Sequence, residues 1–344
     1  MKKLNGKVKV GIIGQGYWGP KLTRNFVDLL GVDHVSIADF KEERLQDVLE
    51  HYPEIKVTRD GKDLIEGDAD AVVIATPVHT HYPLAKKALL AGKHVFVEKP
   101  LSDSSNDAKE LVTLAAENKL TLMVGHTYVF NPAVEAIKTI IDSGDLGEIF
   151  YIYSKRVNLG LLQPDINVMW DLAPHDLSIL CYVLNEEPIS VMAIGENYVN
   201  HVTEQAEIVF MNLKFKDGVR VNIRLSWLDP VKQRKMTIVG SKKMMVYDDI
   251  AEDKIVVYDK GVEVPPYSLT VDEFQASYRH GVEKVYPFEW VEPLRAECKH
   301  FLDNIIHKKH NGKSSGQKGL KIVKILEAAQ RSLVNGGVEL KVEY

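Results

Sequence analysis

The fold is decided by the stretch VKVGIIGQGYWG, residues 8–19, in which a short apolar run ends in the pattern G-x-G-x-x-G and a helical pattern follows. This order predicts a strand, a tight loop and the start of a helix. Gly14 permits the turn, Gly16 lets a phosphate group approach the backbone, and Gly19 lets the helix pack closely against the strand. Free backbone N–H groups and the helix dipole then face an anion, which is typical of a dinucleotide site.

The residues that follow decide between this site and an ordinary glycine turn. The next apolar run, residues 34–38, ends at Asp39, 20 residues after Gly19. At that spacing a carboxylate reaches the ribose hydroxyls of the adenosine and repels a 2′-phosphate. The sequence therefore favours NAD over NADP, although Lys41 lies close enough to weaken the preference.

Length and composition fit a two-domain globular protein. The chain has 344 residues, of which 45% are hydrophobic and 26% charged. A net charge of −5 provides no basic field for nucleic acid. Residues 1–7 carry the charge of a signal peptide without its apolar core, and no run approaches the roughly 20 apolar residues of a membrane span, so we expect a cytoplasmic protein without a membrane partner. Cys181 and Cys298 are expected to be buried free thiols.

Residues 1–126 are predicted to form an NAD-binding Rossmann domain. Apolar runs rich in β-branched residues alternate with amphipathic stretches, which indicates βαβ units and a doubly wound parallel sheet. Gly92 is expected to end the helix over residues 83–91. Ser102 or Ser105 is expected to cap the helix over residues 106–118.

Residues 127–344 are predicted to form an α+β domain for substrate binding and oligomerisation, with an open, largely antiparallel sheet. After a helix at 132–143, strands are expected at 149–155, 190–196, 206–215, 219–227, 236–239, 244–247 and 255–258. Residues 216–218 are the expected hairpin turn. Residues 260–290 suggest an irregular connection, and 308–318 an exposed mobile loop between helices at 292–306 and 319–334. One sheet face, with Arg220, Asn222, Arg224 and Ser226, would meet solvent or another subunit.

The first chemical segment is ATPVHTH, residues 75–81, at the carboxyl end of a Rossmann strand, where ligands bind in such sheets. Thr76, Pro77 and His79 are therefore expected to line the cofactor. His79 and His81 are not expected to hold a metal ion, because no third ligand of suitable spacing follows.

The second segment is Glu98-Lys99-Pro100, at the end of another buried strand. A solvated Glu–Lys pair at a strand end is the ordinary interpretation of such residues. The position opposite the Gly-rich loop favours a catalytic one, because a partly desolvated ammonium can bind a substrate hydroxyl and stabilise a developing alkoxide.

The third segment runs from Trp170 to Leu180 and contains Asp171 and His175, four residues apart on one face of a helix start. The carboxylate can orient the imidazole, which is a natural general base near neutral pH. The alternative makes Asp171 or Asp176 a helix cap and His175 a bystander. Pro174 is expected early in that helix.

Together these segments resemble the Gfo/Idh/MocA family of oxidoreductases over nearly the whole chain. The resemblance rests on the Gly-rich loop, on residues 75–81, on E-K-P at 98–100 and on D-x-x-x-H at 171–175. It implies NAD(P)-dependent oxidoreduction of a sugar or polyol hydroxyl, with Lys99, Asp171 and His175 as catalytic residues. It also implies cofactor contacts from Tyr17, Trp18, Glu98 and Lys99, and a homodimer or homotetramer.

Residues 124–127, 156–160 and 170–178 look most like family members that oxidise nucleotide sugars, such as UDP-N-acetylglucosamine 3-dehydrogenases. This narrower resemblance implies substrate contacts from Arg156 and Asn158, besides Lys99 and His175. A basic cluster at 232–235 could face a diphosphate or be a solvated strand end. The arginine that the family often has after the last Rossmann strand is not evident in residues 126–130.

The expected reaction is hydride transfer from a ring carbon, expected to be C3 of a nucleotide sugar, to nicotinamide. His175 would take the hydroxyl proton, Asp171 would hold His175, and Lys99 would bind the same oxygen. Whether His175 or Lys99 is the base is left open. The alternatives are a dehydrogenase of a free sugar or inositol, an NAD-dependent glycosidase, and a non-catalytic NAD-sensing protein.

Overall fold

The structure is a computed structural model that describes residues 8–163, 165–199, 202, 205–263 and 276–344. The described chain forms two compact units. Residues up to Phe130 and Val291–Lys324 make the first, and Asn131–Trp290 with Ile325–Tyr344 make the second. The predicted boundary at 126 lies close to residue 130, whereas residues 291–324, which the sequence placed with the second domain, pack in the first unit. Residues 1–7, used in the signal-peptide argument, lie outside the described residues.

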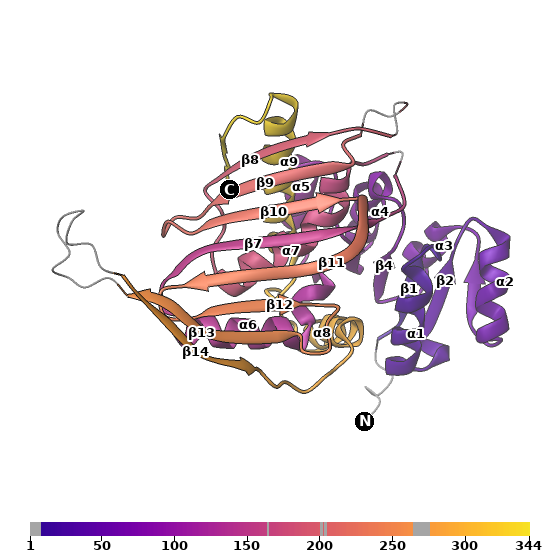
Figure 1. The fold of residues 1–344 in the computed structure, drawn as a ribbon. Coiled ribbons are helices and arrows are strands. Elements are labelled where there is room, and N and C mark those ends of the chain that lie inside the picture. Colours follow the sequence, from indigo (N-terminus) through magenta and orange to yellow (C-terminus); the bar gives the residue numbers. More distant parts are fainter. Residues whose placement is uncertain (1–7, 164, 200–201, 203–204, 264–275) are drawn as a thin grey trace. The chain divides into compact units, whose positions relative to one another are not determined.

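The first unit contains a six-stranded, fully parallel sheet in the order β3-β2-β1-β4-β5-β6. Strands β1, β2 and β4 of this sheet are labelled in Figure 1. Its strands are β1 (Val10–Ile13), β2 (Val35–Ala38), β3 (Lys56–Thr58), β4 (Ala71–Ile74), β5 (His94–Glu98) and β6 (Leu122–Gly125). Its helices are α1 (Gly19–Leu30), α2 (Glu42–His51), α3 (Gly61–Glu66), α4 (His81–Leu90), α5 (Ser105–Glu117) and α8 (Pro293–Ile306), with the short helices η1 (Val32–His34), η2 (Val78–Thr80) and η3 (Thr127–Phe130). The predicted Rossmann fold is confirmed. The strand order reverses between β1 and β4, and the loops that follow these two strands mark the position at which ligands bind in such sheets.

Local sequence accounts for most of these boundaries. β1 and β4 are buried on both faces, as their uninterrupted apolar runs predict for a parallel sheet. Gly92 has φ +75° and follows α4, as expected for a helix stop. The cap of α5 is neither Ser102 nor Ser105 but Ser104, whose Oγ accepts the Asp107 N–H. Ser102 instead donates its hydroxyl to the Ser104 carbonyl and so orders the turn before the cap.

Residues 291–324 complete the first unit from its edge. Phe301 of α8 packs edge-on against Phe26 and Phe96, with ring centroids 6.4 Å and 5.6 Å apart. Ser314 accepts the Val124 N–H at 2.9 Å, and its hydroxyl donates to the Val124 carbonyl. The predicted exposed loop at 308–318 is therefore wrong in its second half, because Ser314 and Ser315 are buried against the β6 edge and α9 (Gly316–Val334) has already begun.

The second unit contains a nine-stranded sheet in the order β14-β13-β12-β11-β7-β10-β9-β8-β15, in which only the β7–β10 pair is parallel among the described strands. The strands are β7 (Ile149–Leu159), β8 (Ser190–Glu196), β9 (Ile208–Lys214), β10 (Arg220–Ser226), β11 (Leu228–Gly240), β12 (Met244–Asp248), β13 (Ile255–Glu263), β14 (Ser277–Val285) and β15 (Leu340–Lys341). The predicted, largely antiparallel sheet is confirmed. β14 corrects the predicted irregular connection, since it pairs with β13 over residues 277–285, while residues 264–275 lie outside the described chain.

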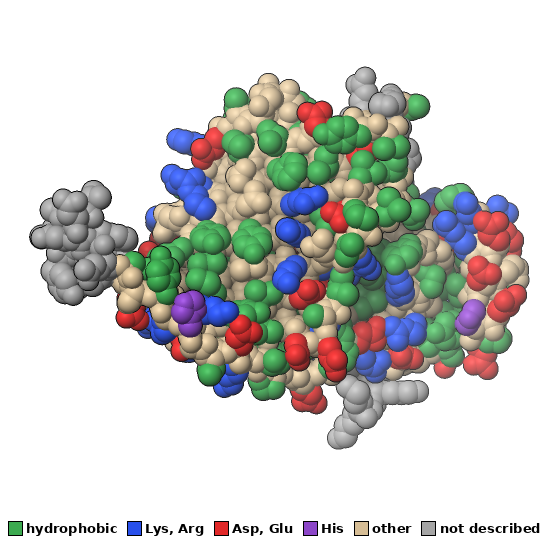
Figure 2. Space-filling view, viewed as in Figure 1, with side chains coloured by type: hydrophobic (Ala, Val, Ile, Leu, Met, Phe, Trp, Pro, Cys, Tyr) green, Lys and Arg blue, Asp and Glu red, His purple; other side chains and the backbone are tan. Residues whose placement is uncertain are grey.

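One face of this sheet is covered by helix α7 (Val168–Leu184), which packs against β7, β9 and β10, and α6 (Pro132–Asp142) packs on α7. The apolar positions 219, 221, 223, 225 and 227 are buried, as predicted. Arg220 and Asn222 are exposed on the other face, where Figure 2 shows hydrophobic, Lys and Arg side chains over the strands. Ser226 is buried rather than exposed to solvent, and its Oγ accepts the Leu228 N–H at the turn into β11.

Two further expectations concern cysteines and membranes. Both cysteines are free thiols, Cys298 buried but Cys181 only half-buried. Within the described residues no helix combines the length and apolar character needed to cross a bilayer.

Candidate active site

The Gly-rich loop has the shape that a diphosphate requires. Gly14 has φ +98°, and a Cβ there would lie 2.5 Å from the Ala75 carbonyl oxygen, so only glycine fits. A Cβ on Gly19 would overlap the Gly14 carbonyl, whereas Gly16 faces open space. Among the described residues no side chain caps α1, and its first turn has no acidic residue. The helix N-terminus is thus available to an anion, and the loop fits a dinucleotide.

Asp39 is held in place at the end of β2. The carboxylate is 5% exposed, and its Oδ2 accepts the backbone N–H of Gln15 at 2.7 Å. Oδ1 accepts the Lys41 N–H at 2.9 Å, and Arg44 Nη1 lies 3.2 Å from Oδ2. These contacts tie the carboxylate directly to the Gly-rich loop. Arg44 was missed from the sequence because a helix-surface arginine carries no signal of its own.

The loops after β1, β4 and β5 are joined by contacts. The turn at Gly14 touches Ala75 and Thr76. His81, which is 1% exposed, lies with Nε2 at 2.8 Å from the Thr76 carbonyl and Nδ1 at 2.8 Å from the Pro100 carbonyl. Burial lowers the pKa of His81, although its two backbone contacts oppose the shift, and the neutral ring donates to only one of the two carbonyls. Its position between them brings the loop that follows β4 next to the loop that holds Lys99. The described residues contain no group of three potential metal ligands.

Side chains at the predicted cofactor positions lie along this carboxyl edge. Tyr17 is largely exposed, Trp18 is half-buried, and the two rings meet edge-on. The Lys21 ammonium lies 3.3 Å from the centroid of the Tyr17 ring and 4.6 Å from that of Trp18. Pro77 and His79 are exposed, and Thr76 is half-buried with its Oγ1 2.5 Å from Thr80 Oγ1.

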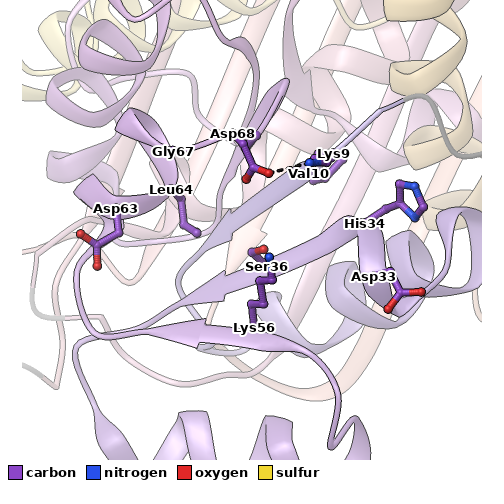
Figure 3. A pocket seen from close by; sticks show the side chains of 11 residues that line it. Lys9, Val10, Asp33, His34, Ser36, Lys56, Asp63, Leu64, Gly67 and Asp68 are labelled. Atoms are coloured by element: carbon purple, nitrogen blue, oxygen red, sulfur yellow. Dashed lines mark hydrogen bonds and ion pairs between the residues drawn. The ribbon is translucent and has the colours of Figure 1, made fainter.

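A small cavity occupies the opposite edge of this sheet. Figure 3 shows Lys9, Asp68, Ser36 and Lys56 around it, at the amino ends of β1 to β3. Lys9 forms an ion pair with Asp68 there. Its volume of about 50 Å³ suits ordered water rather than a dinucleotide. This small cavity is therefore not the candidate site, which the Gly-rich loop and Asp39 place at the carboxyl edge.

In the second unit, α7 carries the predicted acid–base pair. Asn167 caps this helix by accepting the N–H groups of Met169 and Trp170, so neither Asp171 nor Asp176 is its cap. Pro174 lies inside the helix rather than in its first turn. Asp171 Oδ2 accepts the indole N–H of Trp227 at 3.2 Å, which fixes the carboxylate on the face it shares with His175.

Arg156 lies in the interior of the same unit. Its Nε donates to Asp176 Oδ2 at 2.6 Å, and Ser154 Oγ donates to Asp176 Oδ1 at 2.7 Å. The Arg156 and Asp176 side chains are 6% and 3% exposed. A role for Arg156 in substrate binding stays a prediction, and its described geometry is that of a buried ion pair between β7 and α7.

Asn158 lies nearer the end of β7, beside Gly160. A Cβ on Gly160 would lie 2.8 Å from Trp227 Cδ1 and 3.1 Å from Asn158 Nδ2, so the glycine makes room for both side chains. Asn158, Trp227 and Asp171 therefore gather at one end of the second unit. In the basic cluster, Arg234 lies 3.4 Å from Asp249 and Lys235 lies 3.8 Å from Asp248, so acidic neighbours offset part of its charge.

Two protein-family models match parts of the chain. Residues 8–126 match the oxidoreductase family with an NAD-binding Rossmann fold, and residues 134–246 match the GFO/IDH/MocA C-terminal domain. The chain belongs to the Gfo/Idh/MocA family. It is accordingly an NAD(P)-dependent oxidoreductase, and its first unit is an NAD-binding domain.

Relatives within the family act on different substrates. The chain is 26% identical over 267 residues to the UDP-N-acetylglucosamine 3-dehydrogenase of Acidithiobacillus ferrooxidans, covering 75% of this chain and 79% of that protein. It is 25% identical over 268 residues to the myo-inositol 2-dehydrogenase of Thermotoga maritima, covering 74% and 79%. These Gfo/Idh/MocA relatives share a reaction type, but not one substrate.

Two solved structures have the same fold. The Acidithiobacillus ferrooxidans enzyme has a TM-score of 0.78 and 22% identity, covering 96% of this chain and 98% of that one. GenD2 from gentamicin A biosynthesis, solved in complex with NAD, has a TM-score of 0.81 and 18% identity, covering 100% and 98%. At these identities the likeness establishes the fold.

Proposed function

We propose that this Gfo/Idh/MocA oxidoreductase transfers a hydride between a ring carbon of a sugar and NAD, with C3 of a nucleotide sugar such as UDP-N-acetylglucosamine as the substrate position. The observation that carries the proposal is the contact path from Gly14 through Thr76 and His81 to Pro100. This path fixes Lys99 at the same sheet edge as the Gly-rich loop.

Each catalytic residue has a separate task. Bound NAD supplies the nicotinamide ring that exchanges a hydride with the substrate carbon. Lys99 binds the hydroxyl oxygen and stabilises negative charge that develops on it. His175 takes the hydroxyl proton, and Asp171 stabilises the resulting imidazolium. Lys99 and His175 belong to different units, so their action on one oxygen stays a prediction.

The nucleotide-sugar substrate is supported by the resemblance of residues 124–127, 156–160 and 170–178, and by the similarity to a UDP-N-acetylglucosamine 3-dehydrogenase. A second candidate, oxidation of a free inositol, is favoured by the similarity to a myo-inositol 2-dehydrogenase.

The deciding experiment measures NADH formation with a panel of nucleotide sugars, free sugars and inositols. We expect the highest kcat/KM with a UDP-linked N-acetylhexosamine, and product analysis should locate the ketone at C3. Higher kcat/KM with an inositol would favour the second candidate. Repeated turnover of free NAD separates either dehydrogenase from a glycosidase that oxidises its substrate only transiently, and no turnover with any member would contradict the proposal.

A further inference from the structure

Three buried titratable side chains gather where β5 and β6 of the first unit end. Glu98 is the last residue of β5, His126 follows β6, and Glu297 lies on α8. Their exposed fractions are 6%, 2% and 0%. The positive charge of Lys99 acts on both Glu98 and His126, so the charge of this cluster bears on the proposed catalytic ammonium.

In the carboxyl groups of Glu98 and Glu297, only one oxygen of each accepts a hydrogen bond among the described residues. Thr127 Oγ1 donates to Glu297 Oε2 at 2.6 Å, and the Lys99 N–H donates to Glu98 Oε2 at 3.3 Å. Gly125 makes room, since a Cβ there would lie 2.9 Å from Glu98 Oε2. The Oε1 atom of each carboxyl is inaccessible and has no hydrogen-bond partner within the described part of the chain. Ionising both groups would leave two poorly solvated charges, which is costly.

The surrounding charges shift the pKa of Glu98 and the pKa of Glu297 differently. Burial raises the pKa of Glu98 to about 7, although the positive charges of Lys99 and Lys21 oppose this. Burial and then the negative charge of Glu98 raise the pKa of Glu297 well above its usual range, and the Thr127 hydrogen bond opposes the shift. Since the named cations act on Glu98, it is the group that ionises first.

The other neighbours do not compensate a second charge. Burial, assisted by Lys99, lowers the pKa of His126 to about 3, so its imidazole is neutral. Burial raises the pKa of the Cys298 thiol, with further contributions from Glu297, Glu98 and Glu292, so the thiol is neutral too. The pair therefore carries at most one negative charge.

We propose that Glu98 and Glu297 form a buried proton-binding pair in which Glu297 keeps its proton and Glu98 changes its charge, so that Glu98 positions the Lys99 ammonium. The effect on turnover rests on the proposed catalytic role of Lys99. The proton-binding pair itself rests on the packing of the first unit.

The test counts the protons linked to folding, from the slope of unfolding free energy against pH. Unfolded carboxyls have pKa values near 4.3, so the folded chain binds extra protons, and the stability that this pair contributes at low pH is lost as pH rises. Glu297→Gln should remove about one linked proton at both pH 6 and pH 8. Glu98→Gln should remove about one at pH 6 but little at pH 8. Asp303→Asn, on the same helix, is the control and should change neither.

Equal linkage in the wild type and Glu297→Gln at pH 8 would overturn the proton-binding pair. If Glu297→Gln does not fold, Thr127→Val takes its place. This variant removes the hydrogen bond that Thr127 donates to the Glu297 carboxylate, so Glu297 should release its proton at a higher pH. An unchanged release pH would count against the pair.

Turnover supplies the separate test of Glu98. The ionisation near pH 7 should persist in the acid limb of kcat/KM in Glu297→Gln and disappear from it in Glu98→Gln, whereas the part of the limb that the general base His175 contributes should stay in both variants. An acid limb unchanged in Glu98→Gln would overturn its link to Lys99. Absence of turnover in the wild type would instead contradict the proposed function, and the linkage measurement would still decide the proton-binding pair.

Discussion

The Gln15 backbone N–H donates to the Asp39 carboxylate at 2.7 Å, which ties the Gly-rich loop to the end of β2. Arg44 Nη1 lies 3.2 Å from the same oxygen. The residue that the spacing assigned to ribose recognition is thus also part of the loop's own hydrogen bonding.

We expect Asp39 to set the choice of cofactor, because its charge opposes a 2′-phosphate. Wild type should bind NADH more tightly than NADPH, and Asp39→Asn should reduce that preference about tenfold or more, the equivalent of about 1.4 kcal/mol. Asn retains an oxygen for the Gln15 N–H, so it separates charge from loop geometry, whereas Asp39→Ala removes both. Titration of each cofactor by fluorescence measures the preference. Equal affinities of the wild type for NADH and NADPH would contradict the prediction.

Arg44→Gln provides the complementary variant. If the Arg44 guanidinium moderates the repulsion of a 2′-phosphate, Arg44→Gln should weaken NADPH binding more than NADH binding. Arg24→Gln is the control, since Arg24 pairs with Glu292 away from Asp39. Equal losses for the two cofactors would assign Arg44 a purely structural role.

Lys99 and His175 are expected to act on the same oxygen. Lys99→Ala and His175→Ala should each lower kcat by about 10² to 10⁴-fold, the usual range for a general acid or base, with NADH binding nearly intact. The double variant should be far less than multiplicatively worse. Lys87→Ala, at another position in the first unit, is the control. Near wild-type turnover in either single variant would remove that residue from the catalytic set.

The Arg156–Asp176 pair is expected to stabilise the second unit. Arg156→Met leaves Asp176 buried and unpaired, so the free energy of unfolding should fall by about 3–5 kcal/mol, whereas Arg156→Met with Asp176→Leu should recover much of that loss. Lys138→Met breaks a partly exposed pair with Asp142, whose side chains are 23% and 58% exposed, and should cost less than about 1 kcal/mol. Chemical denaturation measures the free energy of unfolding of the wild type and of each variant. An Arg156→Met protein of unchanged stability but raised KM would favour the predicted substrate contact instead.

The open face of the nine-stranded sheet is expected to form a subunit interface. Tyr151 and Tyr153 of β7 are 46% and 40% exposed, and they pair in register with Arg220 and Asn222 of β10. A broad exposed face of this kind favours association. Tyr153→Asp should shift the protein toward monomer in sedimentation, whereas Leu90→Asp, at an exposed apolar position of α4, should not. A wild type that is only monomeric at micromolar concentration would contradict the interface.

The features of the fold that depend on local sequence pattern could be predicted from the sequence. The spacing from Gly19 to Asp39 and the alternation along residues 219–227 lead correctly to the Rossmann sheet and to the buried face of β10. Ser104 was missed because three serines lie within four positions and only the backbone turn selects one. Glu297 gives no signal, since a glutamate in a helical pattern is ordinarily exposed, and its burial depends on strands that end 170 or more residues earlier. The partner of Arg156 was likewise set by packing between β7 and α7.

The return of residues 291–324 to the first unit has a consequence for synthesis on the ribosome. Phe301 closes over Phe26 and Phe96, and Ser314 pairs with the edge of β6, yet both leave the exit tunnel long after that sheet. The nascent sheet must therefore wait with an unpaired edge strand while some 160 intervening residues are translated. We therefore expect a fragment ending at residue 126, which lacks this cover, to be a client of chaperones rather than an independent cofactor-binding module.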